Sequence, residues 1–171
     1  EYKGVELLIN AFKIISEKNT EILLTIIGKG DQYSFLSNLV SELNLDESIK
    51  IRPFQDKSEL IKYIDKSELV IVPSLETKYE FEAGPLTIIE SMARKRICLV
   101  SDSVGFMSYI DNSSALIFES GSLTALVSSL EKFLKMENKE RKNIITNSLK
   151  IVDYFNYDNI SKIHSDFLFD N

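Results

Sequence analysis

The chain has one cysteine, fewer basic than acidic residues and no long apolar run, and each of these shortages argues against a class of protein. Among 171 residues, Cys98 alone can form neither an internal disulfide nor a zinc site built from several cysteines, so we expect it in the core. The longest apolar runs, such as residues 22–27, fall far short of the ~18–20 residues that span a bilayer. Lys and Arg number 20 against 26 Asp and Glu. The net charge of −6 disfavours non-specific nucleic-acid binding, which depends on cations at phosphates.

The remaining composition is that of an ordinary globular domain. Hydrophobic residues make up 44% and charged residues 27%, which excludes general disorder. The length fits one domain, which we assign to residues 1–171. The first residue is Glu1 rather than Met, so we expect the sequence to be a fragment or a processed product.

Helical and strand patterns alternate along the whole chain. Apolar residues at three-and-four spacing predict helices over residues 4–17, 31–44, 58–66, 85–95, 122–136, 138–153 and 157–168. Short apolar runs predict strands over residues 21–28, 49–54, 68–73, 96–101 and 114–118. This alternation predicts an α/β fold with a doubly wound, mostly parallel sheet and helices on both faces, a Rossmann-like arrangement. Ligands bind such sheets at the carboxyl ends of the strands, so the loops that begin there are the first places to inspect.

Two glycines follow the first predicted strand. Gly28-Lys29-Gly30 has the start of a dinucleotide fingerprint, but the third glycine of that fingerprint would fall at Tyr33. A bulky side chain there would prevent the close packing of helix on strand that the fingerprint requires. The glycines therefore indicate either a tight strand-to-helix turn or a turn that lies near a nucleotide without holding its phosphate.

Two glutamates flank a predicted helix start. Glu82 and Glu90 are separated by seven residues, with Gly84-Pro85 between them, and proline suits the first position of a helix. The unpaired N–H groups of a helix start bind anions, and carboxylates accept hydrogen bonds from adjacent hydroxyls such as a ribose diol. This arrangement is what a sugar nucleotide requires. The alternative is a solvated Glu90 and an ordinary loop acid at Glu82, but Glu90 lies on a mostly apolar helix, where a carboxylate needs a partner.

Several short motifs occur in an order that resembles the carboxyl-terminal, donor-binding domain of family 4 retaining glycosyltransferases, which have the GT-B fold. These motifs are Lys3-Gly4, Gly28-x-Gly30, Pro73-Ser74, Glu82 with Glu90 and Ser91-Met92-Ala93, and Ser101-Asp102 with Gly105. The resemblance implies that the first strand of that domain, the arginine that ends it and the amino-terminal acceptor domain are absent from this sequence.

The resemblance also implies roles for individual residues. Lys3 would neutralise the diphosphate leaving group, Glu82 would contact the hydroxyls of the donor sugar, and Glu90 would hold the ribose. The spacing between Ser74 and Glu82 is longer than in the family, so Glu76 and Glu80 remain alternatives for the acidic role. The other positions implied in donor binding are Gly28, Gly30, Phe54, Gly84, Pro85, Leu86 and Gly105.

The implied activity is transfer of a sugar from a UDP- or GDP-linked donor to an acceptor hydroxyl, with the anomeric configuration retained. The acceptor would be a glycan or lipid-linked glycan of cell-surface polysaccharide or lipopolysaccharide. No metal or other cofactor and no nucleic-acid partner is expected. The location would be cytoplasmic, with peripheral association of the whole protein at the inner face of the membrane. The fragment alone is expected to be inactive. The alternatives are a non-catalytic Rossmann-like interaction module and half of a sugar-nucleotide epimerase.

Overall fold

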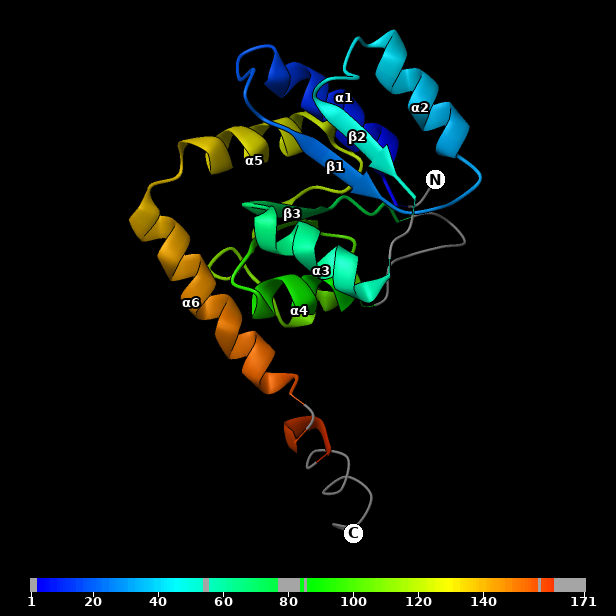
Figure 1. The fold of residues 1–171 in the computed structure, drawn as a ribbon. Helices are drawn as coiled ribbons and strands as arrows, with labels where there is room; N and C mark the ends of the chain where they lie inside the picture. The colour runs from blue at the N-terminus through cyan, green and yellow to red at the C-terminus, as the bar shows by residue number, and fades with distance from the viewer. Residues whose placement is uncertain (1–2, 54–55, 77–83, 85, 157, 162–171) are drawn as a thin grey trace.

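The computed structural model describes residues 3–53, 56–76, 84, 86–156 and 158–161, and it is an α/β structure (Figure 1). Its α-helices are α1 (Val5–Ser16), α2 (Tyr33–Glu42), α3 (Lys57–Lys66), α4 (Leu86–Ala93), α5 (Leu123–Lys135) and α6 (Asn138–Tyr154). Its strands are β1 (Leu24–Ile27), β2 (Ile49–Arg52), β3 (Leu69–Val72), β4 (Ile97–Ser101) and β5 (Leu116–Phe118). Every helix and strand predicted from the sequence up to residue 153 is present. Of the last predicted helix, the described residues 158–161 are helical.

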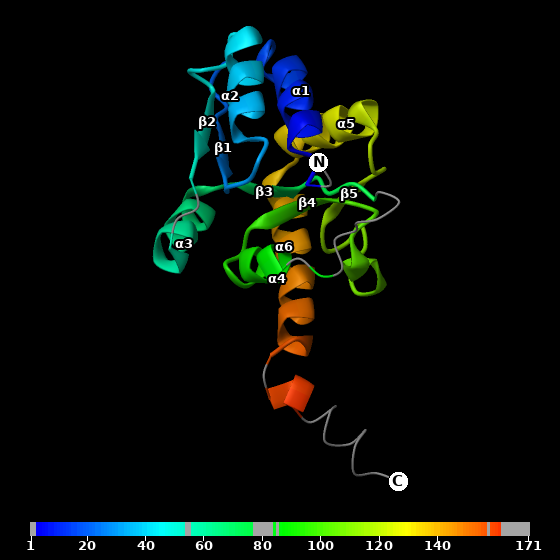
Figure 2. The same ribbon diagram turned by 90° about the vertical axis from the view of Figure 1, so that its right-hand side faces the viewer.

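The strands form two parallel sheets among the described residues. One sheet has the order β1-β2 and the other the order β3-β4-β5. Helices α1, α2 and α5 lie on one side of the strands and α3, α4 and α6 on the other (Figures 1 and 2). The prediction of parallel strands between two layers of helices is therefore confirmed, with the strands divided between two sheets.

The central strand β4 alternates between two cores. Ile97 and Leu99 pack in the cluster formed with α1 and α5, whereas Cys98 and Val100 pack with α4 and α6. All five residues of β4 are buried. Burial raises the pKa of the Cys98 thiol to about 12, because a thiolate there would be desolvated. The prediction that Cys98 belongs to the core is confirmed.

Two helices end where the backbone turns left-handed. Lys95 has a φ of 59°, and the N–H of Arg96 donates to the carbonyl of Ser91 at 3.0 Å. Asn44 has a φ of 55° after α2, and the N–H of Leu45 donates to Val40 at 3.0 Å. These bonds satisfy carbonyls of the last helical turns. They explain why α4 ends at Ala93, two residues before the predicted end.

The first 3₁₀ turn after β4 was not predicted. Element η1 (Gly105–Ser108) buries Phe106, whose ring centroid lies 4.9 Å from that of Phe155 beyond α6. A four-residue turn is too short to produce a helical period, so the sequence pattern does not reveal it.

Ser91→Ala is expected to raise the free energy of unfolding by about 1 kcal/mol, since a buried hydroxyl without a partner is costly. The Ser91 hydroxyl is fully buried in α4 and has no hydrogen-bond partner in the part of the chain that the structure describes. Urea denaturation measures the effect. The matched control is Ser148→Ala in α6, whose buried hydroxyl donates to Ile145 at 2.9 Å, and which should lose about 1 kcal/mol. Equal losses for both variants would contradict the assignment.

Candidate functional site

A single backbone carbonyl after β3 accepts hydrogen bonds from three side-chain hydroxyls. Ser101 Oγ donates to the Ser74 carbonyl at 2.6 Å, and Ser103 Oγ donates to it at 2.9 Å. Ser120 Oγ, after β5, lies 3.4 Å from the same oxygen. Ser74 and Ser101 are almost completely buried. These bonds fix the start of the loop that leads from β3 to α4, and with it one side of the candidate site.

Gly4 joins two of the sequence motifs in space. Its φ is 64°, and a Cβ atom added there would lie 1.8 Å from the carbonyl oxygen of Pro73. Only a residue without a side chain fits so close an approach of two backbone segments. The Lys3-Gly4 and Pro73-Ser74 motifs are therefore neighbours, and this places the exposed Lys3 beside the carboxyl end of β3.

The start of α4 carries no acidic side chain in its first turn. The positive end of its dipole is therefore not neutralised by its own residues, which suits an anion. Leu86 at this end is 73% exposed. Gly84 is also exposed, and the Phe106 ring would lie 3.8 Å from a Cβ added to it.

Glu90 forms an ion pair that was not predicted. Its Oε1 lies 3.3 Å from the Nζ of Lys57, which belongs to the first turn of α3. The Glu90 side chain is 35% exposed and that of Lys57 is 77% exposed. Helix α4 is mostly apolar, as the sequence indicated, but it is not buried all round, since Leu86, Thr87 and Ala93 are exposed. Glu90 is half-buried, and its partner is a cation from another helix.

The position of Lys57 is electrostatically unusual. A cation in the first turn of a helix is disfavoured by the helix dipole. The N-cap of α3 is Asp56, whose carboxylate accepts from Ser58 Oγ at 2.7 Å and from the N–H of Glu59 at 3.0 Å. These bonds hold the pKa of the Asp56 carboxyl below its usual value. Because Asp56 is engaged in capping, Glu90 is the carboxylate that pairs with Lys57.

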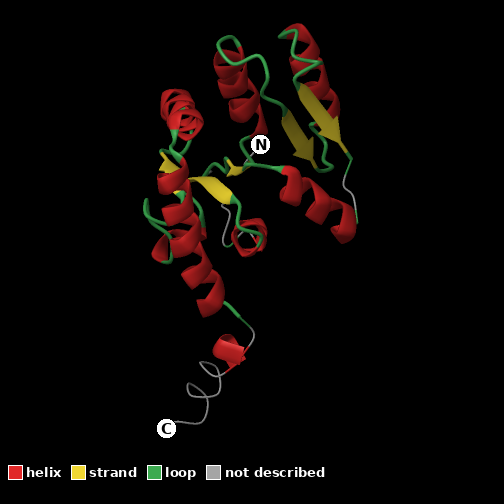
Figure 3. Ribbon diagram, turned by 60° about the vertical axis from the view of Figure 1, so that its left-hand side comes forward, coloured by secondary structure: helices red, strands yellow, loops and turns green. Residues whose placement is uncertain are grey.

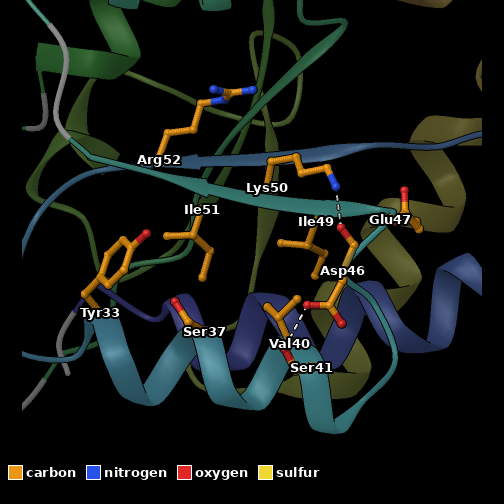
Figure 4. A pocket seen from close by; sticks show the side chains of 10 residues that line it. All are labelled: Tyr33, Ser37, Val40, Ser41, Asp46, Glu47, Ile49, Lys50, Ile51 and Arg52. Carbon is orange, nitrogen blue, oxygen red and sulfur yellow. Dashed lines mark hydrogen bonds between the residues drawn. The ribbon is translucent and has the colours of Figure 1, made fainter.

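A separate cleft of about 450 Å³ is lined by residues of α2 and β2 and of the loop between them (Figure 4). Ile49 and Ile51 point from the strand toward α2, whereas Arg52 points away from that helix. Arg52 lies over the Tyr63 ring of α3, 5.8 Å from its centroid. None of the residues around Glu90, Ser74 or Gly84 lines this cleft, so it is distinct from the candidate site.

The remaining predicted positions divide into two groups. Gly30 and Gly105 are exposed, and open space surrounds the position of a Cβ at Gly28 and at Gly30. Glu82, Pro85, Phe54 and the alternative Glu80 lie outside the described residues. The described alternative, Glu76, is exposed.

Sequence reasoning missed Lys57, Ser103 and Ser120. Serine is a common residue, and Ser74 and Ser120 are 46 positions apart. No spacing in the sequence therefore reveals the hydroxyl cluster. A lysine directly after a capping aspartate was the one available signal, because the helix dipole opposes it.

Within the described ranges, no group of three or more His, Cys, Asp or Glu side chains could hold a metal ion. No helix among these residues combines the length and the apolar character needed to cross a membrane.

Known proteins share this fold and sequence pattern. The amylovoran biosynthesis glycosyltransferase AmsK of Erwinia amylovora is 25% identical over 158 residues, which are 91% of this chain and 39% of that protein. The crystal structure of Anabaena HepE in complex with UDP and glucose superposes with a TM-score of 0.83 at 16% identity, over 98% of this chain and 45% of that one. The carboxyl-terminal domain of the group 1 glycosyl transferase LpcC of Francisella tularensis gives a TM-score of 0.75 at 20% identity, over 90% of this chain and 80% of that one.

The fold is the Rossmann-like half of a GT-B glycosyltransferase. The model of the family "Glycosyl transferases group 1" matches residues 1–151, and the chain belongs to that family. The chain spans 38–39% of the length of the first curated relatives that it matches.

Gly4→Ala is expected to lower the free energy of unfolding by about 2–4 kcal/mol, because both the positive φ and the contact with Pro73 oppose a side chain. Thermal or chemical denaturation measures the loss. Gly28→Ala is the control, since a Cβ there meets nothing within 4 Å and its change should stay within about 1 kcal/mol. Similar stabilities for the two variants would contradict the close approach at Gly4.

Ser101→Ala is expected to lower the free energy of unfolding by about 1–2 kcal/mol, since its short, buried bond to the Ser74 carbonyl is lost. Ser120→Ala, whose hydroxyl lies at 3.4 Å from the same oxygen, should change it by less than about 0.5 kcal/mol. A loss at Ser120 as large as that at Ser101 would contradict the order of importance that the two distances predict.

Proposed function

We propose that the chain is the donor-binding domain of a family 4 retaining glycosyltransferase that moves a sugar from a nucleoside-diphosphate sugar to an acceptor hydroxyl. The observation that carries this proposal is the position of Glu90. It is held half-buried on α4, the helix whose first turn carries no acidic side chain. A diphosphate at that helix start and a ribose at Glu90 would satisfy both features.

The Glu90–Lys57 pair adds a second element to the recognition of the ribose. Lys57 is close to Oε1 of Glu90, and a diol that binds there meets an acceptor on one residue and a donor on the other. Each hydroxyl of the diol both donates and accepts, so the pair is suited to it. We assign Lys57 to the donor site on this ground.

Lys3 is proposed to stabilise the diphosphate leaving group. Gly4 brings Lys3 to the carboxyl end of β3, and a cation near the departing diphosphate stabilises the charge that develops in the transition state. Glu82 is proposed to contact the donor sugar because its spacing from Glu90 matches the family motif. The reaction is proposed to need no metal, to act at the cytoplasmic side of the membrane and to serve cell-surface polysaccharide synthesis. The similarity to AmsK, a glycosyltransferase of amylovoran biosynthesis, supports the proposed role in polysaccharide synthesis.

The binding of UDP to HepE supports a nucleotide donor for this chain as well. Isothermal titration calorimetry of the product of the complete gene with UDP and with GDP tests the proposal and identifies the base. Product analysis separates the alternatives: a new glycosidic bond indicates transfer, an epimerised donor indicates an epimerase, and binding of neither nucleotide indicates an interaction module.

Glu90→Gln is expected to weaken nucleotide affinity about tenfold, because hydrogen bonds from hydroxyls to a charged carboxylate are stronger than those to an amide. Lys57→Met should weaken it about threefold to tenfold through the loss of a donor beside the diol. Calorimetry with UDP and with its 2′-deoxy analogue measures both effects. Either substitution should also reduce the difference in affinity between UDP and the 2′-deoxy analogue.

The control variants make the same kinds of substitution in ion pairs away from the candidate site. Glu68→Gln removes a carboxylate that pairs with Arg141 at 2.8 Å, and Lys62→Met removes the lysine that pairs with Glu59 on α3. Both should bind the nucleotide as the unchanged protein does. Full affinity in Glu90→Gln would overturn the assigned role of Glu90 and favour the interaction module.

A further inference from the structure

The first turn of α3 contains no buried side chain. Lys57 and Ser58 are exposed, and the two residues that follow them are half-buried. The buried residue of this helix is Ile64, which lies in its second half. Figures 2 and 3 show α3 at the periphery of the molecule. The conformation of the first turn therefore depends on local hydrogen bonds more than on packing against the core.

Asp56 supplies these local hydrogen bonds. As the N-cap of α3, its carboxylate accepts from the N–H of Glu59 at 3.0 Å and from Ser58 Oγ at 2.7 Å. Its carbonyl accepts from the N–H of Leu60 at 3.0 Å, which begins the bonds of the helix backbone. The first N–H groups of a helix have no partner within the helix, and helix ends fray. The cap therefore holds the backbone from which Lys57 projects.

The Lys57 side chain depends on this support. It is 77% exposed, and a long exposed side chain loses conformational entropy when it is held in one place. Its Nζ lies 3.3 Å from Oε1 of Glu90, which belongs to another helix. If the first turn of α3 unwinds, the Cα of Lys57 moves and the two charges separate. The cap of α3 therefore controls whether the ammonium and the carboxylate face the same ligand.

We propose that Asp56 is a positioning residue of the donor site, which acts on the nucleotide through Lys57 by capping the turn that carries this lysine. The proposal rests on the ribose site assigned above to Glu90 and Lys57. The Asp56 carboxylate is engaged with Ser58 and Glu59, so no contact with the ligand is assigned to it. It determines the fraction of molecules in which Lys57 and Glu90 are placed together for the diol.

A double-mutant cycle in the product of the complete gene tests the proposal. Calorimetry uses UDP or GDP, whichever binds more tightly, and the 2′-deoxy analogue of that nucleotide. Asp56→Ala should weaken nucleotide affinity about threefold and reduce the preference over the 2′-deoxy analogue, because both side-chain bonds of the cap are lost. The double variant Asp56→Ala/Lys57→Met should bind as Lys57→Met alone does. A residue that acts through another has no effect once the other is removed.

Two further variants separate positioning from a general loss of stability. Asp56→Asn keeps an acceptor oxygen at the N-cap, where Asn is as favourable as Asp, and should retain the affinity of the unchanged protein. Ser122 caps α5 in a similar way: it accepts from the N–H of Ala125 at 3.3 Å and lies 3.2 Å from Thr124 Oγ1. Helix α5 lies on the other side of the strands from α3 (Figures 1 and 2). Ser122→Ala should lower the temperature of unfolding as Asp56→Ala does, without a change in nucleotide affinity.

The outcomes distinguish this proposal from the donor site itself. Full affinity in Asp56→Ala, or a loss in the double variant equal to the product of the two single losses, would overturn the positioning role while the effect of Lys57→Met remained. Equal losses in Asp56→Asn and Asp56→Ala would contradict the capping mechanism. Full affinity in both Lys57→Met and Glu90→Gln would rule out the ribose site, and the positioning role with it.

Discussion

The close approach of Gly4 to Pro73 is the constraint on which the arrangement depends. It joins the start of α1 to the end of β3, although the two are about 70 positions apart in the chain. Because α1 packs against both sheets, this contact also determines where β1 and β2 stand relative to β3, β4 and β5. Lys3 and the root of the β3–α4 loop at Ser74 become neighbours for the same reason.

The site is built from two kinds of interaction that differ in how much a substitution affects the structure. The hydroxyl cluster at the Ser74 carbonyl is buried and short-ranged, so small changes there alter the structure itself. The Glu90–Lys57 pair is half-exposed, and exposed ion pairs add at most about 1 kcal/mol to stability. The buried hydrogen bonds therefore maintain the loop geometry, while the ion pair can rearrange when a ligand arrives.

Much of the fold could be predicted because its strands are short apolar runs and its helices bury a periodic apolar stripe. The apolar run of β4 and the periodic stripe of α5 identify a strand and a helix without tertiary information. Helix ends were less accurate, since the left-handed residue Lys95 has none of the usual preference for that conformation. For the site, the sequence indicated Glu90 but not its partner. Lys57 and Glu90 are 33 residues apart on different helices, and only the packing of α3 beside α4 brings their charges together.

Because Cys98 is buried in β4, the reactivity of its thiol reports how often that strand becomes exposed to solvent. Thiolate is the species that reacts with alkylating agents, and a thiol with a pKa of about 12 supplies almost none of it at neutral pH. No second cysteine competes for the reagent. The rate at which iodoacetamide modifies this one sulfur therefore tracks how often the middle strand of the β3-β4-β5 sheet becomes accessible, without any label being introduced.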